Sequence, residues 1–210
     1  MIWYVTRPHL LSEKCYPNPI PPLDNATMLQ TKPTLSRADY LQLDAQSDEK
    51  HEFLDGQVYA MAGGTFHHAR VSGNIFAILR QALRGKPCQP MNSDMRVHTP
   101  SGLDTYPDVS VFCGEPELTD NQRTLLNPLI IIEVLSPSTR DYDRVGKFTH
   151  YRSIAGLQDY LLVDPETVLV EHFHRLKRDE WLLRVYSSLE DSLTLDNIGV
   201  TVNIRTFYEG

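Results

Sequence analysis

Two acidic residues lie in segments whose composition is typical of β-strands. Asp108 is in YPDVSVFCG, and Glu133 is the one charged residue of PLIIIEVLS. An unpaired carboxylate buried among isoleucines would cost several kcal/mol, so Glu133 requires a partner. If the two strands are neighbours, about 4.8 Å apart, both carboxylates can converge on one hard cation such as Mg²⁺, which takes oxygen ligands at about 2.0–2.1 Å. These residues therefore predict a divalent-metal site.

A lysine follows these acids in a helical segment. Asp143 and Lys147 are spaced i, i+4, which is the spacing of an ordinary ion pair on a helix surface. Alternatively, Lys147 could extend back across the end of the sheet, orient the attacking water and stabilise negative charge on a phosphate. The spacing alone allows both interpretations.

Three further residues are candidates for the same site. Glu52, beside a predicted turn, could complete an acidic cluster or be solvated. His68, in GGTFHHAR at a helix start, could contact the substrate or a water on the metal, or only pack there. Asp94, in NSDMRV, could add a carboxylate, although an acid in a turn or an edge strand is the favoured interpretation.

Other patterns of reactive residues are weaker. His172 and His174 share a strand face and could chelate a metal, but the sequence shows no third ligand at a recognisable spacing, so we expect surface histidines. Ser136, in EVLSPS, lacks the Gly-x-Ser-x-Gly context, and no Gly-x-x-x-x-Gly-Lys loop is present. Serine hydrolases and P-loop nucleotide hydrolases are therefore disfavoured.

The N-terminal half of the chain contains clear element boundaries. Ser36 followed by Asp39 predicts a capping box that opens a helix through about residue 45, with Leu35 as a possible hydrophobic staple. Strands are predicted at 51–54 and 57–62 because they flank the turn dipeptide Asp55-Gly56. Apolar residues at helical spacing predict a helix over 66–84, stopped by Gly85.

The remaining segments predict a mixed central β-sheet flanked by helices. Strands are expected at 88–98 and 106–113, and the apolar run PLIIIEVLS at the sheet centre. In the second of these strands Asp108 and Ser110 face one side, and Val109 and Val111 the other. A mixed polar helix is expected at 140–154, ending at Gly156, followed by strands in DYLLVD, TVLVEHFHR and EWLLRVYS. The fold class is thus α/β (α+β), with an N-terminal helix and β-hairpin.

The distribution of prolines divides the chain in two. Residues 1–33 contain a proline density that opposes regular helix and central strand, so they are predicted to form an arm, and residues 34–210 a single domain. A start of translation at Met28 would make the first 27 residues an upstream artefact. An ordered arm that packs on a neighbouring molecule is the alternative.

Composition limits the possible partners. The 210 residues carry a formal charge of −7, which opposes non-specific attraction to phosphate backbones, so any nucleic-acid role must depend on local patches or a metal. No apolar run approaches the roughly 20 residues that cross a bilayer, which predicts a soluble cytoplasmic protein without membrane contact. Cys15, Cys88 and Cys113 lack Cys-x-x-Cys spacing, so we expect reduced thiols.

The order of YPDVSVFCG and NPLIIIEVLSPSTRDYDRVGKFTHYRSIAGLQDYLLVD resembles the Uma-two family of restriction-endonuclease-like proteins, within the PD-(D/E)XK nuclease superfamily. The segment HEFLDGQVYAMAGGTFHHARVSGNI extends the resemblance, which covers about residues 34–186. The resemblance implies Asp108 and Glu133 as catalytic metal ligands with Glu52 as a supporting acid, and His68 at the substrate. Leu135 occupies the position at which the superfamily motif has its lysine. In the Uma-two family that lysine is taken to lie on the following helix, and Lys147 is at the matching position.

The implied activity is Mg²⁺-dependent hydrolysis of DNA phosphodiester bonds, with Mn²⁺ as a possible substitute, by a homodimer that cuts both strands. Two alternatives stay open, because many roles share this fold and site. One is a non-catalytic module that binds nucleic acid or protein. The other is a hydrolase of a non-nucleic-acid phosphoester, which suits the net acidity of the chain.

Overall fold

The structure is a computed structural model that describes residues 34–61, 63–137 and 139–210, all within one compact unit. The predicted arm at 1–33 lies outside the described residues, and so does the alternative start at Met28. No helix of the described residues has the length and apolarity that crossing a membrane requires.

The segment around Glu133 forms a central strand of the largest sheet. This sheet has the order β12-β11-β10-β9-β6-β3. Its strands are β3 (Cys88–Asn92), β6 (Val109–Cys113), β9 (Ile130–Val134), β10 (Asp159–Asp164), β11 (Leu169–Lys177) and β12 (Glu180–Tyr186). Strand β9 runs parallel to β10 and antiparallel to β6, so the sheet is mixed, as predicted.

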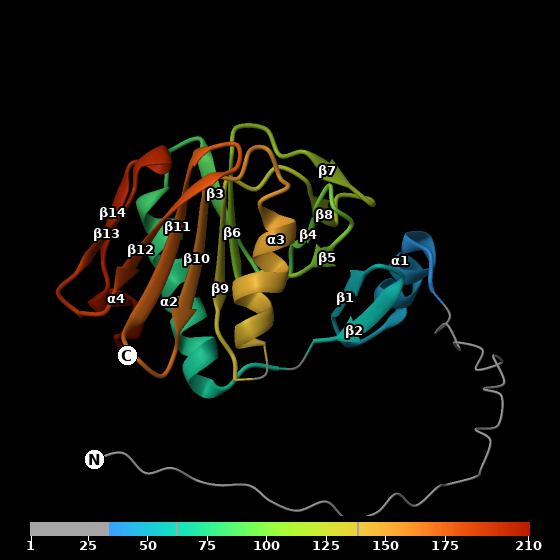
Figure 1. Cartoon of the computed structure of the whole chain (residues 1–210), viewed down its shortest axis with the longest axis horizontal. Helices are drawn as coiled ribbons and strands as arrows, with labels where there is room; N and C mark the ends of the chain where they lie inside the picture. Colours follow the sequence, from blue (N-terminus) through green and yellow to red (C-terminus); the bar gives the residue numbers. More distant parts are fainter. Residues whose placement is uncertain (1–33, 62, 138) are drawn as a thin grey trace, which may run out of the picture. The chain divides into compact units, whose positions relative to one another are not determined.

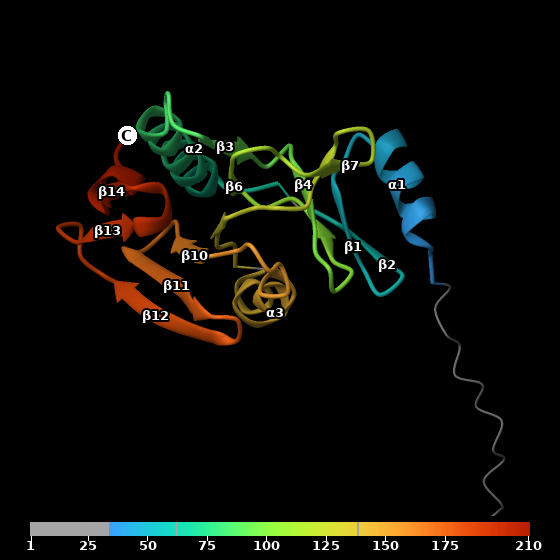
Figure 2. The ribbon, with the colours of Figure 1, turned by 90° about the horizontal axis from the view of Figure 1, so that it is seen from above.

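Helices cover both faces of the central sheet (Figures 1 and 2). Helix α2 (Phe66–Ala82) buries Val71, Ile75 and Leu79 against one face. On the other face lie η1 (Tyr142–Lys147), a π-helix, and α3 (Phe148–Tyr151), which together form the connection between the parallel strands β9 and β10. Every residue of β9 is buried because both of its faces are covered.

A second sheet lies beside the central one in the described unit. Its order is β2-β1-β5-β4-β8-β7. The strands are β1 (His51–Leu54), β2 (Gln57–Ala60), β4 (Arg96–His98), β5 (Asp104–Thr105), β7 (Leu118–Thr119) and β8 (Thr124–Leu125). The remaining elements are α1 (Arg37–Gln46), β13 (Ser192–Leu195), the 3-10 helix η2 (Asp196–Ile198), β14 (Val200–Asn203) and α4 (Arg205–Tyr208).

The predicted helix start at Ser36 and the predicted hairpin turn are confirmed. Ser36 and Asp39 form a reciprocal capping box at the start of α1. Asp55 and Gly56 join β1 to β2 with φ angles of 50° and 77°, the left-handed conformation that a tight hairpin turn needs. The second predicted strand, 57–62, is too long, because β2 ends at Ala60 and Met61 is outside it; residue 62 lies outside the described residues.

Two further predicted strands differ from the expectation. The segment 88–98 is broken because Asn92 accepts a hydrogen bond from the Asp94 backbone N–H at 3.2 Å and turns the chain from β3 into β4. The segment 106–113 becomes a strand only at Val109, since Pro107 has no N–H to donate to a sheet. Asp108 therefore precedes strand β6 instead of lying inside it. The predicted faces of β6 are correct, with Val109 and Val111 in the α2 core.

The predicted helix at 140–154 contains an unpredicted π-helical segment, η1. Its wide turn brings the Tyr142 ring over Gly146, where a Cβ would lie 2.4 Å from the ring atom Cδ2. The hydroxyl of Tyr160 donates to the Asp143 carbonyl at 2.9 Å, which ties this segment to β10. Single π-turns inside helices are frequent at functional sites.

The expectation of reduced thiols is wrong for Cys88 and Cys113, and Cys15 lies outside the described residues. Cys88 and Cys113 are directly opposite each other in the β3–β6 pair and form a disulfide. A sequence separation of 25 residues does not by itself indicate a disulfide, whereas the strand register places the two cysteines opposite each other.

Candidate active site

Asp108 and Glu133 meet at one end of the β6–β9 pair. Val109 pairs with Ile132 in this antiparallel ladder, which places Asp108 opposite Glu133. The backbone N–H of Val134 donates to Asp108 Oδ2 at 2.7 Å, and the backbone N–H of Asp108 donates to Glu133 Oε2 at 3.3 Å. The strand backbones thus hold both carboxylates in place.

The carboxylate of Glu133 is almost completely buried, with 3% of the residue exposed. Its Oε1 accepts a hydrogen bond from the Tyr151 hydroxyl at 2.7 Å. Burial raises the pKa of Glu133 to about 8, although the charge of Lys147 acts in the opposite direction. A second cation beside this group would favour its ionised form.

Lys147 extends from η1 into the same cluster. Its Nζ lies 2.8 Å from Glu52 Oε1, 3.3 Å from Glu133 Oε1 and 3.3 Å from Asp143 Oδ1. Burial alone would lower the pKa of Lys147, but the surrounding carboxylates raise it well above its ordinary value. Lys147 is therefore a buried cation. The i, i+4 pair with Asp143 exists, but it is not the surface ion pair that was one of the two interpretations.

Glu52 contacts Lys147. Its Oε1 also accepts a hydrogen bond from the Thr105 hydroxyl at 2.6 Å, so strands β1 and β5 both help to fix the carboxylate. The structure does not show a three-ligand cluster that contains Glu52, Asp108 and Glu133. Among the described residues, the metal-type group of three lies elsewhere, at Asp159, His172 and His174.

His68 approaches Asp108 from the first turn of α2. Its Nε2 lies 3.3 Å from Asp108 Oδ2, and this contact raises the pKa of His68 despite its partial burial. Thr65 caps the helix by accepting a hydrogen bond from the His68 backbone N–H at 3.2 Å. Gly64 leaves room for the imidazole, because a Cβ at Gly64 would lie 2.5 Å from His68 Nδ1.

One pocket of about 790 Å³ contains these groups. Its lining includes five of the six candidate residues, Glu52, His68, Asp108, Glu133 and Lys147, together with the wall residues Tyr59, Met61, Tyr106 and Tyr142. Asp94 is not part of the lining. It is three-quarters exposed and pairs with Lys50 at 2.8 Å, which agrees with the turn acid that the sequence favoured.

The donor set of this pocket suits a hard divalent cation. Asp108 and Glu133 contribute carboxylate oxygens, the ligand type that Mg²⁺ and Mn²⁺ prefer. Both carboxylates line the pocket, and the side chain of Asp108 is 17% exposed. A cation can therefore reach them from the pocket. Glu52 would have to leave Lys147 to become a ligand, so its predicted role at the metal stays a prediction.

Residues 37–205 match the family model Uma2, described as "Putative restriction endonuclease". The chain belongs to the Uma2 family. Two uncharacterized proteins of Synechocystis sp., slr1290 and sll1609, are each 38% identical to it. The first match covers 85% of this chain and 93% of the relative, and the second covers 74% and 89%.

The fold of this Uma2 protein is also found in a solved structure, described as a putative nuclease belonging to DUF820 from Anabaena variabilis. The TM-score is 0.68 at 16% sequence identity, and the match covers 81% of this chain and 96% of the other. The fold likeness and the family match confirm the predicted family and the nuclease-type fold.

Some contacts of the Uma2 pocket were not predicted from the sequence. Tyr151, whose hydroxyl binds Glu133, lies four residues after Lys147, a spacing that puts two side chains on one helix face. That spacing could have identified it. The hydroxyl of Thr105 belongs to β5, a strand of two residues, and no periodic pattern marks it.

The expectation of surface histidines on β11 is wrong. His172 is 1% exposed, and His174 is partly buried. Their third partner is Asp159 on the neighbouring strand β10, directly opposite His174 in the ladder. Because that partner is distant in sequence, spacing within β11 could not indicate it.

Proposed function

We propose that this protein is a divalent-metal-dependent endonuclease that hydrolyses DNA phosphodiester bonds, with Mg²⁺ as the metal and Mn²⁺ as a substitute. The observation that carries the proposal is the approach of Lys147 Nζ to Glu133 Oε1, at 3.3 Å, in the pocket that also contains Asp108. A metal-dependent nuclease uses carboxylates that hold the cation, and a fixed positive charge beside the scissile phosphate stabilises the negative charge that develops there.

In this proposal Asp108 and Glu133 hold the cation. When bound, it polarises the phosphate and lowers the pKa of water. Lys147 stays protonated, because three carboxylates surround it, so its role is to orient water and to stabilise negative charge on the phosphate. Glu52 positions Lys147 through their contact at 2.8 Å. His68 contacts the substrate at the pocket side of Asp108.

The net charge of −7 supports a second candidate, hydrolysis of a small phosphoester. Long polyanions are repelled by an acidic surface, whereas a small substrate needs only the pocket. The two candidates share the metal ligands and differ in the length of the substrate.

A cleavage assay tests the proposal. Supercoiled, linear and single-stranded DNA are incubated with the wild-type protein, with Asp108→Asn and with Asp94→Asn, each with and without Mg²⁺ or Mn²⁺. We expect metal-dependent cleavage by the wild type and by Asp94→Asn, reduced more than about 100-fold in Asp108→Asn. Asp94→Asn is the matched control, because it changes an acid outside the pocket.

The possible results separate the candidates. Cleavage that Asp108→Asn retains would show that the assigned metal site is wrong. Metal-dependent hydrolysis of a small aryl phosphodiester without DNA cleavage would favour the second candidate. DNA binding without hydrolysis of either substrate would favour a non-catalytic module.

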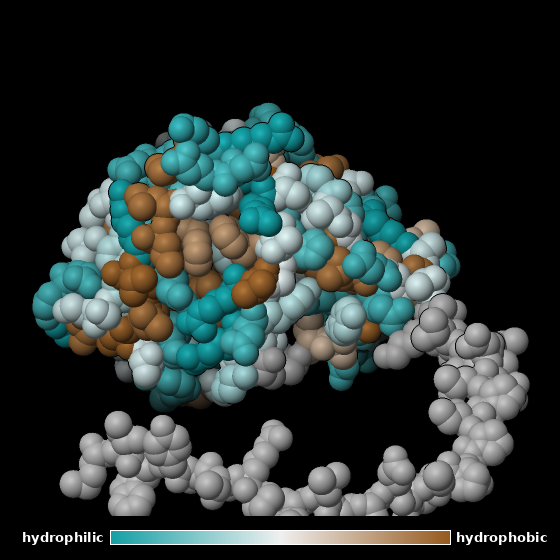
Figure 3. Space-filling view, in the orientation of Figure 1, coloured by the Kyte–Doolittle hydropathy of each residue, from teal (hydrophilic) through white to brown (hydrophobic). Residues whose placement is uncertain are grey.

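We further propose that a homodimer is the active species, since cutting both strands together needs two copies of the site. Edge strand β12 exposes Leu183 and Val185, and β11 exposes Leu176. Figure 3 shows apolar side chains gathered over these two strands. A large exposed apolar patch favours association. The molecular mass in solution, measured at the concentrations of the cleavage assay, tests this, and a monomer would contradict it.

A further inference from the structure

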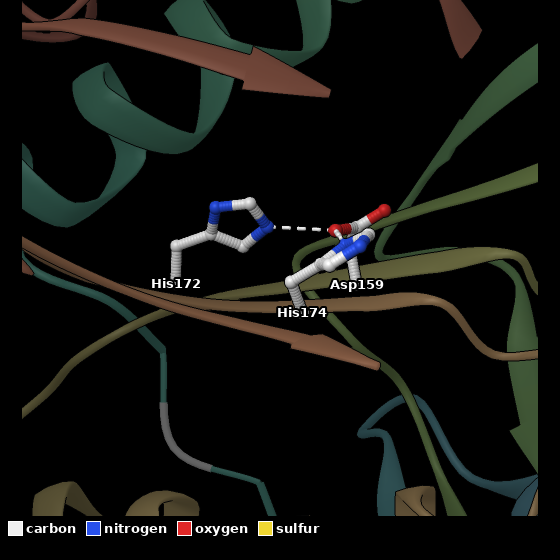
Figure 4. Close-up of side chains that lie close together, drawn as sticks. All are labelled: Asp159, His172 and His174. Atoms are coloured by element: carbon white, nitrogen blue, oxygen red, sulfur yellow. Dashed lines mark hydrogen bonds and ion pairs between the residues drawn. The ribbon is translucent and has the colours of Figure 1, made fainter. Parts of the chain in front are cut away.

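A second cluster of metal-ligating groups lies away from the candidate active site. His172 Nε2 and His174 Nδ1 lie 2.7 and 2.8 Å from the same oxygen, Oδ1 of Asp159. Figure 4 shows both imidazoles directed at that carboxylate. The three ligand atoms lie within 4.8 Å of one another.

This cluster is on the opposite face of the central sheet from Glu133. Leu162 pairs with Glu133 in the β9–β10 ladder, whereas Asp159 is an odd number of residues from Leu162 and faces the other side. Asp159 pairs with Ile130, three residues before Glu133 along β9. The two clusters therefore form separate sites.

The charge of Asp159 requires compensation. The residue is completely buried, and among the described residues its ion-pair partners are the two imidazoles, with no lysine or arginine. Neutral imidazoles leave a buried carboxylate without a countercharge, which is costly. Asn197 of η2 donates a hydrogen bond to Oδ2 at 3.2 Å, which holds the carboxylate but supplies no charge. A bound cation would supply it.

We propose that Asp159, His172 and His174 form a second metal site, selective for Zn²⁺ or a similar imidazole-binding transition metal. Two nitrogen ligands and one carboxylate oxygen suit such a metal, whereas Mg²⁺ prefers oxygen ligands. A Zn²⁺ ion with bonds of about 2.0–2.2 Å would take the place of the two hydrogen bonds that now join the imidazole nitrogens to Asp159 Oδ1. The side chain of His174 is 21% exposed, so the site opens to solvent there, and water can complete the coordination.

The metal would join three elements of the fold. It would link β10 to β11 directly, and Asn197 would connect the same carboxylate to the turn between β13 and β14. A ligand that binds only the folded state stabilises that state. The site therefore has a structural role that is independent of the hydrolytic pocket.

Zinc binding by the full chain tests the proposal. The protein is prepared without a histidine tag, stripped with a chelator and titrated with Zn²⁺ in competition with a chromophoric chelator. Asp108→Asn serves as the background, so that the candidate active site does not contribute. We expect one Zn²⁺ per chain. His174→Gln should reduce the affinity for Zn²⁺ more than about 100-fold, because loss of a direct ligand costs more than loss of a residue that only hydrogen-bonds to a ligand.

His67→Gln is the matched control, because His67 also contacts a carboxylate, Glu166 at 2.9 Å, at an exposed position. The affinity of the His67→Gln variant for Zn²⁺ should equal that of the Asp108→Asn background protein. The glutamine in His174→Gln can still donate to Asp159, and circular dichroism checks that the variant is folded. Co²⁺ absorption of the background protein, which needs no further variant, should show bands of nitrogen and oxygen coordination.

Two results would overturn the proposal. One is a background protein that takes up no Zn²⁺ at stoichiometric concentrations and gives no Co²⁺ bands. The other is uptake that His174→Gln and His67→Gln leave equally strong, which would place the metal elsewhere.

Discussion

The ammonium group of Lys147 lies 3.3 Å from Oε1 of Glu133, and both side chains are more than nine-tenths buried. Lys147 is the last residue of the π-helix η1, which follows β9 in the chain. Its ammonium group therefore contacts the carboxylate of Glu133 on β9. Two further acids, Glu52 and Asp143, contact the same ammonium group. This arrangement has consequences for stability as well as for catalysis.

Lys147→Met should destabilise the fold. It removes the cation that the described structure places beside three buried carboxylates, and loss of one partner of a buried ion pair costs about 3–5 kcal/mol. Urea denaturation at pH 8 measures the change. Lys50→Met is the control, since the partly exposed pair with Asp94 should contribute less than about 1 kcal/mol. Equal losses in both variants would contradict the prediction.

Gly64→Ala should impair the site without unfolding the protein. The new Cβ would lie 2.5 Å from His68 Nδ1, so the imidazole has to leave its contact with Asp108. We expect about tenfold slower cleavage and a nearly unchanged urea midpoint, one tenfold step being about 1.4 kcal/mol of activation free energy. At Gly63 a Cβ meets nothing within 4 Å, so Gly63→Ala should cleave at the wild-type rate. If the two alanine variants are equally active, His68 has no role at Asp108.

Local patterns were sufficient to predict much of the fold and the site. The capping box at Ser36, the hairpin turn at Asp55 and the alternation along β6 each depend on residues within a few positions, and the structure contains all three. Asp108 and Glu133 were predicted to share a cation on the condition that their strands are neighbours, and the β6–β9 pairing meets that condition. The pocket includes them with Lys147, as the family resemblance implied.

Features that depend on register or on distant partners were not predictable in this way. The second sheet contains strands of two residues, such as β5, too short for periodicity. The π-helix is defined by backbone hydrogen bonds between residues i and i+5, and the spacing of apolar residues does not reveal that pattern. The Cys88–Cys113 disulfide and the burial of His172 both follow from which strand lies beside which.

Reduction of the Cys88–Cys113 disulfide should lower the free energy of unfolding by about 3 kcal/mol, because an open chain gains conformational entropy when the loop is released. Urea denaturation with and without dithiothreitol measures the effect. A double variant, Cys88→Ala with Cys113→Ala, should have a similar stability in both conditions. A wild-type protein that dithiothreitol leaves equally stable would show that the two strands are held by packing alone.

The acid Asp104 should make the stability of the fold dependent on pH. Arg37 donates to it at 2.8 and 2.9 Å, and His98 lies 3.0 Å away. Burial alone would raise the pKa of Asp104, but the hydrogen bonds from His98 and Arg37 outweigh burial and hold the pKa below its usual range. Because the folded pKa is lower than the unfolded value of about 3.9, Asp104 stabilises the protein above about pH 4. That contribution disappears as the pH falls through the folded pKa.

Asp104→Asn tests this linkage. At pH 7 the variant should be less stable than the wild type by about 1.5–3 kcal/mol, the usual value of hydrogen bonds to a charged group. The difference should narrow as urea denaturation is repeated at pH values below 4, because the wild-type carboxyl becomes protonated and loses the same interaction. Asp94→Asn, which changes an exposed ion pair, should stay within about 1 kcal/mol of the wild type at every pH. A constant difference between pH 7 and pH 3 would show that Asp104 acts through packing and not through its charge.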